Sequence, residues 1–265
     1  MDVTMDNFQP LQGTAVLLVA HPDDEVIAFG ALLQKMKEAF VVFATDGAPR
    51  DDSFWQQYES RETYIQVRRQ EACEALNIVD AHPVFLWERV PGGLADQELF
   101  KHLPAAIQAF EQVIAETNPD CLLTLAYEGG HPDHDAVCFM AWAAGRRMKL
   151  PVWESPLYHR YPDGSRAVQM FPTKTGEEIE LKVEGAVLEK KLQMFHTYKS
   201  QQLVLDGFRP EIEQFRPMMD YDFTTRPLPW KLNYEQWQWK MTGEDVAEAF
   251  ASYLRRHPER SEESL

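Results

Sequence analysis

The sequence predicts an α/β fold: a Rossmann-like, doubly wound, mostly parallel sheet flanked by helices, with a C-terminal elaboration that contains short strands. Short apolar runs of strand length alternate with longer helical segments over residues 14–150, which is the pattern of βαβ units. The pattern of the sequence changes after Pro151, where turn residues separate short segments. A length of 265 residues with 45% hydrophobic and 26% charged residues is typical of a globular chain.

Apolar runs without alternation indicate strands that are buried on both faces. We expect such strands at residues 15–20, 40–45, 84–87 and 121–126. The first helix should follow the loop at 21–25 and end near Lys37, and the last should follow the loop at 127–134 and end near Met148. Two further helices are expected at residues 61–76 and 97–117.

Beyond Pro151 the expected elements are shorter. Tyr161–Ser165 is a turn between hairpin strands, residues 185–201 are helical, and residues 209–239 carry no assignment. The aromatic cluster within 221–239 is interpreted as core or interface packing, with stacking on a sugar ring as the alternative.

The predicted domain organisation follows from this change of sequence pattern after Pro151. We expect an N-terminal extension at 1–13, a single α/β domain at 14–253 and a charged tail at 254–265. Within the domain, residues 14–150 form the catalytic core and residues 151–253 shape the substrate site.

Charge and composition exclude several classes of partner. With 26 Lys and Arg against 42 Asp and Glu, the net charge is −16, which argues against nucleic-acid binding. The apolar run Ala15–Ala20 is far shorter than the roughly 20 residues needed to span a bilayer, and residues 1–13 do not resemble a signal peptide. The three cysteines are too scattered for a disulfide framework. We expect a cytoplasmic protein with no membrane partner.

The tripeptide His-Pro-Asp occurs twice, at His21–Asp23 and at His131–Asp133. Each copy follows an apolar strand and precedes a helix. Ligands of open α/β sheets bind outside the carboxyl ends of the strands. Both loops therefore fall where a site is expected.

These loops hold the residue types of a catalytic metal site. His21 and Asp24 stand three residues apart in a loop-to-helix turn, and His134 can supply a third ligand from the other loop. Two imidazoles and one carboxylate form a typical catalytic zinc set that leaves a position for water. Asp23 then remains as a general base, and His131 as a donor to an oxyanion or a leaving group.

Other interpretations of the same residues stay open. The acidic residues could serve only as favourable charges at helix N-termini, and Asp135 is interpreted in that way. Two histidines and a carboxylate also form the triad of mononuclear iron(II) oxygenases. Asp133–Asp135 suggests a two-metal phosphoesterase. A metal-binding module without catalysis is a further alternative.

The segment Ala20–Glu25 together with Gly130–His134 resembles the zinc-dependent deacetylase family that includes PIG-L and LmbE-like proteins. The resemblance covers residues 14–148 and a short stretch at 190–201. It implies hydrolysis of the N-acetyl group of an N-acetylated aminosugar or glycoconjugate, with one Zn2+ per chain and Fe2+ as an alternative ion. It implies His21, Asp24 and His134 as metal ligands, Asp23 as base and His131 as the histidine that faces the oxyanion. A homo-oligomer is compatible with it.

The resemblance extends to a helix element and a strand motif. Thr45–Gly47 looks like the second-strand motif of the family. Arg68 with Glu71 looks like its Arg-x-x-Glu element, whose arginine is linked to substrate binding; a surface ion pair is the alternative.

Two later positions are weaker matches. Tyr127 is expected to close over the substrate, with a rim aromatic as the alternative. His196 with Ser200–Gln201 resembles a late motif, although a packed core histidine is the favoured interpretation of His196. No stretch after Pro151 matches one subfamily, and the lack of a membrane helix argues against a glycolipid-anchor substrate.

Overall fold

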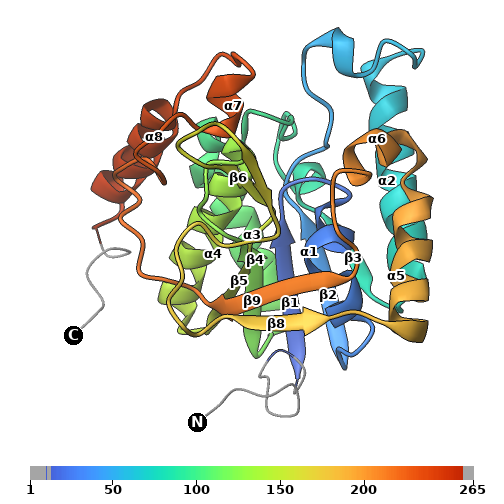
Figure 1. Ribbon diagram of the computed structural model, residues 1–265. Coiled ribbons are helices and arrows are strands. Elements are labelled where there is room, and N and C mark those ends of the chain that lie inside the picture. The colour runs from blue at the N-terminus through green and yellow to red at the C-terminus, as the bar shows by residue number, and fades with distance from the viewer. Residues whose placement is uncertain (1–9, 11–12, 259–265) are drawn as a thin grey trace.

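The computed structural model describes residue 10 and residues 13–258 of the chain (Figure 1). Most of the predicted N-terminal extension, and residues 259–265 of the predicted tail, lie outside the described residues. The central sheet has the strand order β3-β2-β1-β4-β5-β9-β8. Its strands are β1 (Thr14–Val19), β2 (Glu38–Phe43), β3 (His82–Phe85), β4 (Cys121–Leu125), β5 (Val152–Ser155), β8 (Ile179–Lys182) and β9 (Ile212–Pro217).

The middle of the sheet is parallel and buried, as continuous apolar runs require. Val16 pairs with Phe40 of β2 on one side and with Leu122 of β4 on the other. The order of the parallel strands reverses between β1 and β4, which makes this position the switch point where open α/β sheets bind ligands. The predicted α/β fold with a mostly parallel sheet is confirmed.

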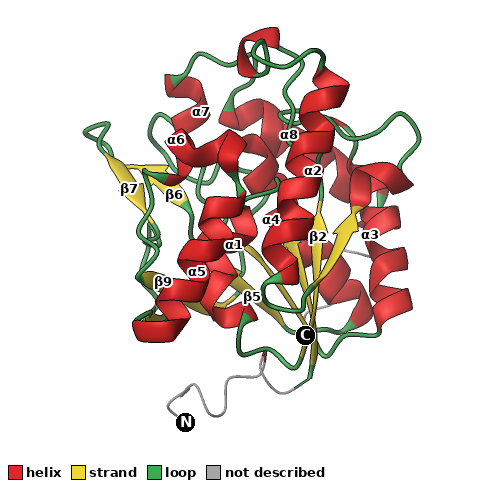
Figure 2. Cartoon of the chain, turned by 90° about the vertical axis from the view of Figure 1, so that its right-hand side faces the viewer, coloured by secondary structure: helices red, strands yellow, loops and turns green. Residues whose placement is uncertain are grey.

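Helices cover both faces of this sheet. The layer on the right of Figure 1 holds α1 (Asp24–Leu33), α2 (Arg61–Asn77) and α5 (Gly185–Thr197). The opposite layer holds α3 (Leu103–Thr117), α4 (Pro132–Met148) and α8 (Gly243–Arg256). Figure 2 shows the same arrangement from the side. None of the helices in the described part of the chain combines the length and the apolar character needed to cross a membrane.

The segment after Pro151 contributes to the sheet rather than forming a separate layer. β9 pairs antiparallel with β5, and β8 pairs antiparallel with β9. The predicted hairpin consists of β6 (Tyr158–Arg160) and β7 (Arg166–Val168). The short helix α6 (Gln202–Leu205) lies between α5 and β9, and the short helix α7 (Asn233–Gln236) lies between β9 and α8. Four 3-10 helices complete the described elements: η3 (Asp52–Phe54), η4 (Leu86–Arg89), η5 (Leu99–Lys101) and η6 (Lys199–Gln201).

Several predicted boundaries are wrong. α1 ends at Leu33 rather than near Lys37, and α3 begins at Leu103 rather than at residue 97. The second difference has a local cause, because Gln97 has a φ of 70°, a conformation that a right-handed helix excludes. The last turn of α8 also reaches Arg256, within the segment predicted as a tail.

Candidate active site

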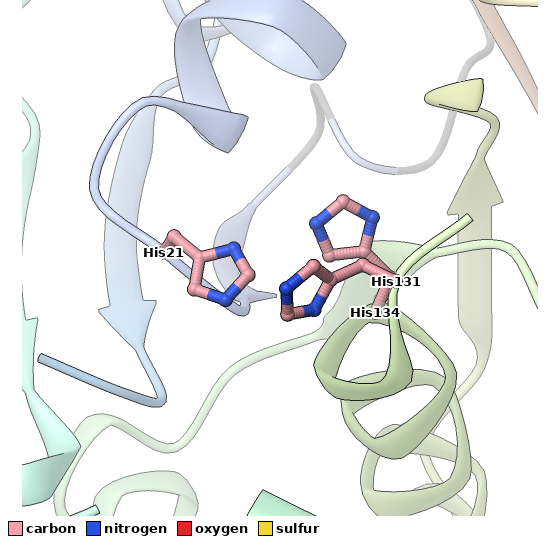
Figure 3. Close-up of side chains that lie close together, drawn as sticks. All are labelled: His21, His131 and His134. Atoms are coloured by element: carbon pink, nitrogen blue, oxygen red, sulfur yellow. The ribbon is translucent and has the colours of Figure 1, made fainter. Parts of the chain in front are cut away.

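The two His-Pro-Asp loops meet at the carboxyl ends of β1 and β4, which are neighbours in the sheet. His21 stands two residues after the end of β1, His131 caps the N-terminus of α4, and His134 lies in the first turn of that helix. Their rings converge in Figure 3. The ring centroid of His21 lies 4.4 Å from that of His131 and 5.3 Å from that of His134. All three histidines are buried.

The carboxylate of Asp24 joins the two loops. Its Oδ2 accepts hydrogen bonds from the backbone amides of Ala20, at 3.1 Å, and of His21, at 2.8 Å. The same oxygen lies 3.5 Å from His21 Nδ1, while Oδ1 lies 3.3 Å from His134 Nε2. Burial disfavours the charged form, but the two histidines outweigh it and hold the pKa of Asp24 well below its usual range. The structure thus brings the three predicted ligands together around an ionised carboxylate.

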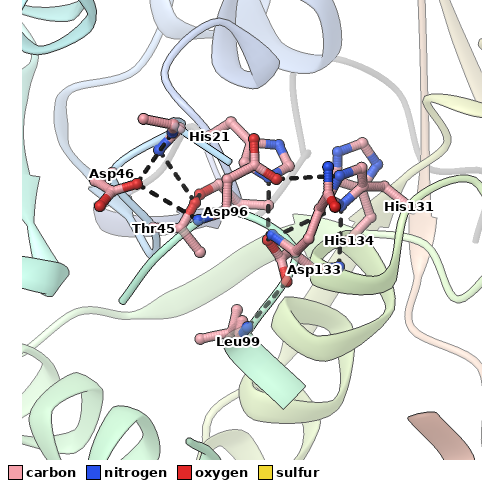
Figure 4. A network of polar contacts seen from close by, with 12 residues as sticks. His21, Thr45, Asp46, Asp96, Leu99, His131, Asp133 and His134 are labelled. Atoms are coloured by element: carbon pink, nitrogen blue, oxygen red, sulfur yellow. Dashed lines mark hydrogen bonds and ion pairs between the residues drawn. The ribbon is translucent and has the colours of Figure 1, made fainter. Parts of the chain in front are cut away.

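Asp96 belongs to the same cluster, although no sequence pattern predicted it. Its Oδ1 lies 3.3 Å from Nε2 of His21 and 3.3 Å from Nε2 of His131 (Figure 4). The residue stands in the loop before η5, and no motif surrounds it. The available signal was its position after β3, because the loops that follow parallel strands open at the same edge.

The described residues therefore offer two overlapping groups of potential metal donors. One consists of His21, His131 and His134, and the other of His21, Asp96, His131 and Asp133. In the second group Asp133 already has a structural task, because its carboxylate accepts the amide hydrogens of Gln97, at 2.7 Å, and Leu99, at 3.0 Å. These two bonds fasten the loop that carries Asp96 to the start of α4.

His131 has one ring nitrogen engaged and the other facing the cluster. Nδ1 accepts the backbone amide of Asp133 at 3.1 Å. A neutral imidazole that accepts at Nδ1 carries its proton on Nε2, the atom that lies near Asp96. Burial, together with the nearby His21, lowers the pKa of His131 and favours this neutral form. His131 is therefore poised to donate a hydrogen bond from Nε2.

Asp23 has an unusual backbone and a charged neighbour. Its φ is 121°, a strained value for any residue but glycine. The backbone amide of Asp23 donates to Glu25 Oε2 at 3.0 Å, and the hydroxyl of Tyr198 donates to Glu25 Oε1 at 2.5 Å. Burial raises the pKa of Asp23 to about 7, although the guanidinium of Arg68, 3.3 Å away, acts in the opposite direction.

The Arg-x-x-Glu element of α2 does not form a surface ion pair, so that alternative is wrong. Arg68 and Glu71 are both buried, and each has its own partners. Besides Asp23, Arg68 donates to the carbonyl oxygens of Pro22 and Gly47. Glu71 accepts from the amide of Ser200 at 2.8 Å and from its hydroxyl at 2.6 Å. The element therefore ties the first loop to η6.

Two other predicted positions lie away from the cluster. Tyr127 is buried among aromatic rings, and its hydroxyl donates to the carbonyl oxygen of Thr225 at 2.8 Å. It does not line the cavity that the histidines face, because its ring points into the core between α4 and α8. His196 is exposed on α5, so the favoured interpretation as a packed core histidine is wrong.

The cluster opens into a cavity of about 180 Å³. Asp23, Asp24, Arg68 and Asp96 line it together with the three histidines. Its remaining walls are largely apolar and include Tyr158, Trp237 and Trp239. A buried group of titratable side chains in a partly apolar cavity is the usual form of an active site.

Comparison with solved structures shows the same fold in other proteins. The A40926 pseudoaglycone deacetylase Dbv21 is 24% identical, over 78% of this chain and 97% of that chain, with a TM-score of 0.61. The zinc-inhibited form of the teicoplanin deacetylase Orf2 is 19% identical, over 77% and 97%, with a TM-score of 0.57. The 4-carboxy-2-hydroxymuconate hydratase GalB of Pseudomonas putida KT2440 is 16% identical, over 78% and 96%, with a TM-score of 0.50.

Comparison of sequences gives a more specific result. No curated protein matches the chain. Residues 16–145 match the model of the PIG-L family, which is described as GlcNAc-PI de-N-acetylase. This range contains both His-Pro-Asp loops and α2 with Arg68. The chain therefore carries a PIG-L family domain over residues 16–145.

Proposed function

We propose that the protein is a metal-dependent amide hydrolase that removes the N-acetyl group of a sugar-like substrate and releases acetate and a free amine. One observation carries the proposal: the side chains of both His-Pro-Asp loops converge on one cavity, with Asp24 between His21 and His134. The family match and the deacetylases among the structural neighbours support the same reaction.

The donor set fits a catalytic metal ion. His21, Asp24 and His134 are buried, they come from two loops, and their side-chain types are those of an open three-ligand zinc site. Zn2+ is the proposed ion, one per chain, and Fe2+ suits the same ligands. A divalent ion held there supplies Lewis-acid polarisation of the amide carbonyl and makes the attacking water more acidic. One structural neighbour, the teicoplanin deacetylase Orf2, was solved in a zinc-inhibited form, which supports the binding of zinc by a protein of this fold.

The proton transfers fall to residues outside the ligand set. Asp23 lines the cavity beside the ligands and takes the proton of the water that attacks the carbonyl carbon. The N–H at His131 Nε2 donates to the oxygen that becomes negative in the tetrahedral intermediate. The C–N bond then breaks, and the proton held by Asp23 passes to the departing amine.

Arg68 has a different task from the one that the family resemblance suggests. Its guanidinium lines the cavity, but it is engaged with Asp23, Pro22 and Gly47. We infer that Arg68 holds the carboxylate of Asp23 in place and favours its ionised form. Direct contact between Arg68 and the substrate is then less important than this positioning of Asp23.

Release of amine tests this proposal. The protein would be stripped of metal, reloaded with zinc and given N-acetylglucosamine conjugates and simple acetamides, with Asp23→Asn as the control. We expect zinc-dependent release of amine and acetate in equal amounts, lost in the variant. Because GalB, a neighbour in fold, is a hydratase, unsaturated hydroxy acids belong in the panel. Their hydration without any release of amine would overturn the proposal.

A further inference from the structure

The mouth of the cavity carries three exposed hydrophobic side chains, which we call the apolar rim: Phe54, Val204 and Trp237. They are 44%, 50% and 45% exposed, respectively, and each lines the cavity. They come from η3, from α6 and from the turn after α7, three segments far apart in the sequence. Exposed large hydrophobic side chains on a soluble protein commonly indicate a binding surface when they gather at one place.

Aromatic contacts connect this rim to the histidines. The ring of Trp239 lies 5.0 Å from that of His131 and 5.0 Å from that of Trp237. On the other wall, the ring of Tyr158 lies 5.3 Å from that of His134 and 6.5 Å from that of Trp237. The rim and the proposed metal ligands therefore belong to one continuous cavity.

The backbone of the Trp237–Trp239 turn is adapted to this arrangement. Gln238, between the two tryptophans, has a φ of 59°, the left-handed region that side chains other than glycine rarely adopt. Both of its neighbours line the cavity. Strain of this kind is found where a particular placement of side chains matters to function.

We propose that the apolar rim binds an aryl or alkyl group that the substrate carries beyond its amide. The inference rests on the proposed function in one respect, since the amide is taken to lie at the histidines. Because the rim and the histidines line the same cavity, a molecule whose amide lies at the histidines can place a neighbouring group against the rim. Three hydrophobic side chains there match an apolar group and offer little to the hydroxyl groups of a bare sugar.

A series of N-acetyl-β-glucosaminides with methyl, hexyl and phenyl aglycones tests the proposal. Burying a methylene group strengthens binding about fourfold. We therefore expect kcat/KM for the hexyl and phenyl compounds to exceed that for the methyl compound by at least about tenfold. Equal values across the series would overturn the inference and leave the proposed function standing.

Two neighbouring residues of α6 provide a matched pair of variants. Val204 lines the cavity, whereas Leu203, which is 93% exposed, does not. Val204→Ser should remove most of the preference for the hexyl compound, and Leu203→Ser should keep it. Trp237→Ala and Phe54→Ala should act like Val204→Ser. Loss of the preference in both α6 variants would show a general effect of the helix and would overturn the inference.

Binding without turnover separates the two proposals. Hexyl and methyl β-glucoside, which lack an amide, would be titrated by calorimetry into the full-length protein. Tighter binding of the hexyl compound that Val204→Ser abolishes supports the rim even if no amide is ever hydrolysed. If Val204→Ser instead changes the oligomeric state in size-exclusion chromatography, a second copy of the chain covers the rim and the inference fails.

Discussion

The guanidinium of Arg68 lies 3.3 Å from the carboxylate of Asp23. Burial raises the pKa of Asp23 to about 7, and the positive charge of Arg68 opposes this rise. A base must be ionised to accept a proton. With Asp23 as the proposed base, the pair is expected to set the lower end of the pH range of activity.

Replacing Arg68 should therefore move the acidic limb of the pH profile. Without the positive charge the ionised form of Asp23 loses a stabilising partner, and the pKa of Asp23 rises. In Arg68→Met the rise of kcat/KM with pH should begin at higher pH than in the wild type, and Arg68→Lys should lie between the two. Profiles of kcat/KM against pH provide the measurement. An acidic limb at the same pH in all three proteins would rule out this role.

Removing the carboxylate of Asp23 tests the base itself. Asp23→Asn keeps the shape of the side chain but cannot accept the proton of the attacking water. We expect kcat to fall by about two to four orders of magnitude, while zinc content measured by atomic emission stays at one ion per chain. Turnover close to that of the wild type would mean that another group is the base.

The proposed ligand set of His21, Asp24 and His134 and the donor group that contains Asp96 make different predictions about metal binding. Loss of a group beside a ligand costs about 10–100-fold in metal affinity, and loss of a ligand should cost more. We expect His134→Ala to weaken zinc binding by at least about 100-fold and Asp96→Asn to have a much smaller effect. Competition with a fluorescent chelator measures both. A larger loss of zinc affinity in Asp96→Asn than in His134→Ala would place the ion between His21, Asp96 and His131.

A buried ion pair between α5 and β9 is expected to contribute to the stability of the fold rather than to activity. Lys191 Nζ lies 2.6 Å from Glu213 Oε1, and both side chains are inaccessible to solvent. Lys191→Met leaves the charge of Glu213 buried without its partner and should cost about 3–5 kcal/mol in the free energy of unfolding. The exposed pair of Arg255 and Glu248 serves as the control, and Arg255→Met should cost less than about 1 kcal/mol. Urea denaturation that gives equal losses would contradict this assignment.

The central fold could be predicted because its signals are local. Apolar runs such as Ala15–Ala20 indicate buried strands, and the rule for parallel sheets places the loops that follow them at one edge. The approach of His21 to His134 follows from these two facts alone. β9 was missed because its pairing with β5 is a contact between segments distant in sequence, which no local pattern reports.

The rest of the site depends on packing that the sequence does not display. Asp96 reaches the histidines because the carboxylates of Asp133 and Asp46 hold the backbone of its loop. Tyr127 precedes the glycine pair by two residues and was expected to close over the substrate, but its ring packs in the aromatic cluster between α4 and α8.

Zinc titration of the metal-stripped protein tests whether hydrolysis depends on a zinc ion held by the two His-Pro-Asp loops. Acetate release from an N-acetylated aminosugar would be followed as zinc is added to the wild type and to Asp23→Asn. We expect activity to rise from near zero to a plateau at one equivalent of zinc per chain, and the variant to bind the same equivalent without activity. Full activity of the stripped wild-type protein, or equal activity of the variant, would contradict a metal-dependent hydrolase built on the two His-Pro-Asp loops.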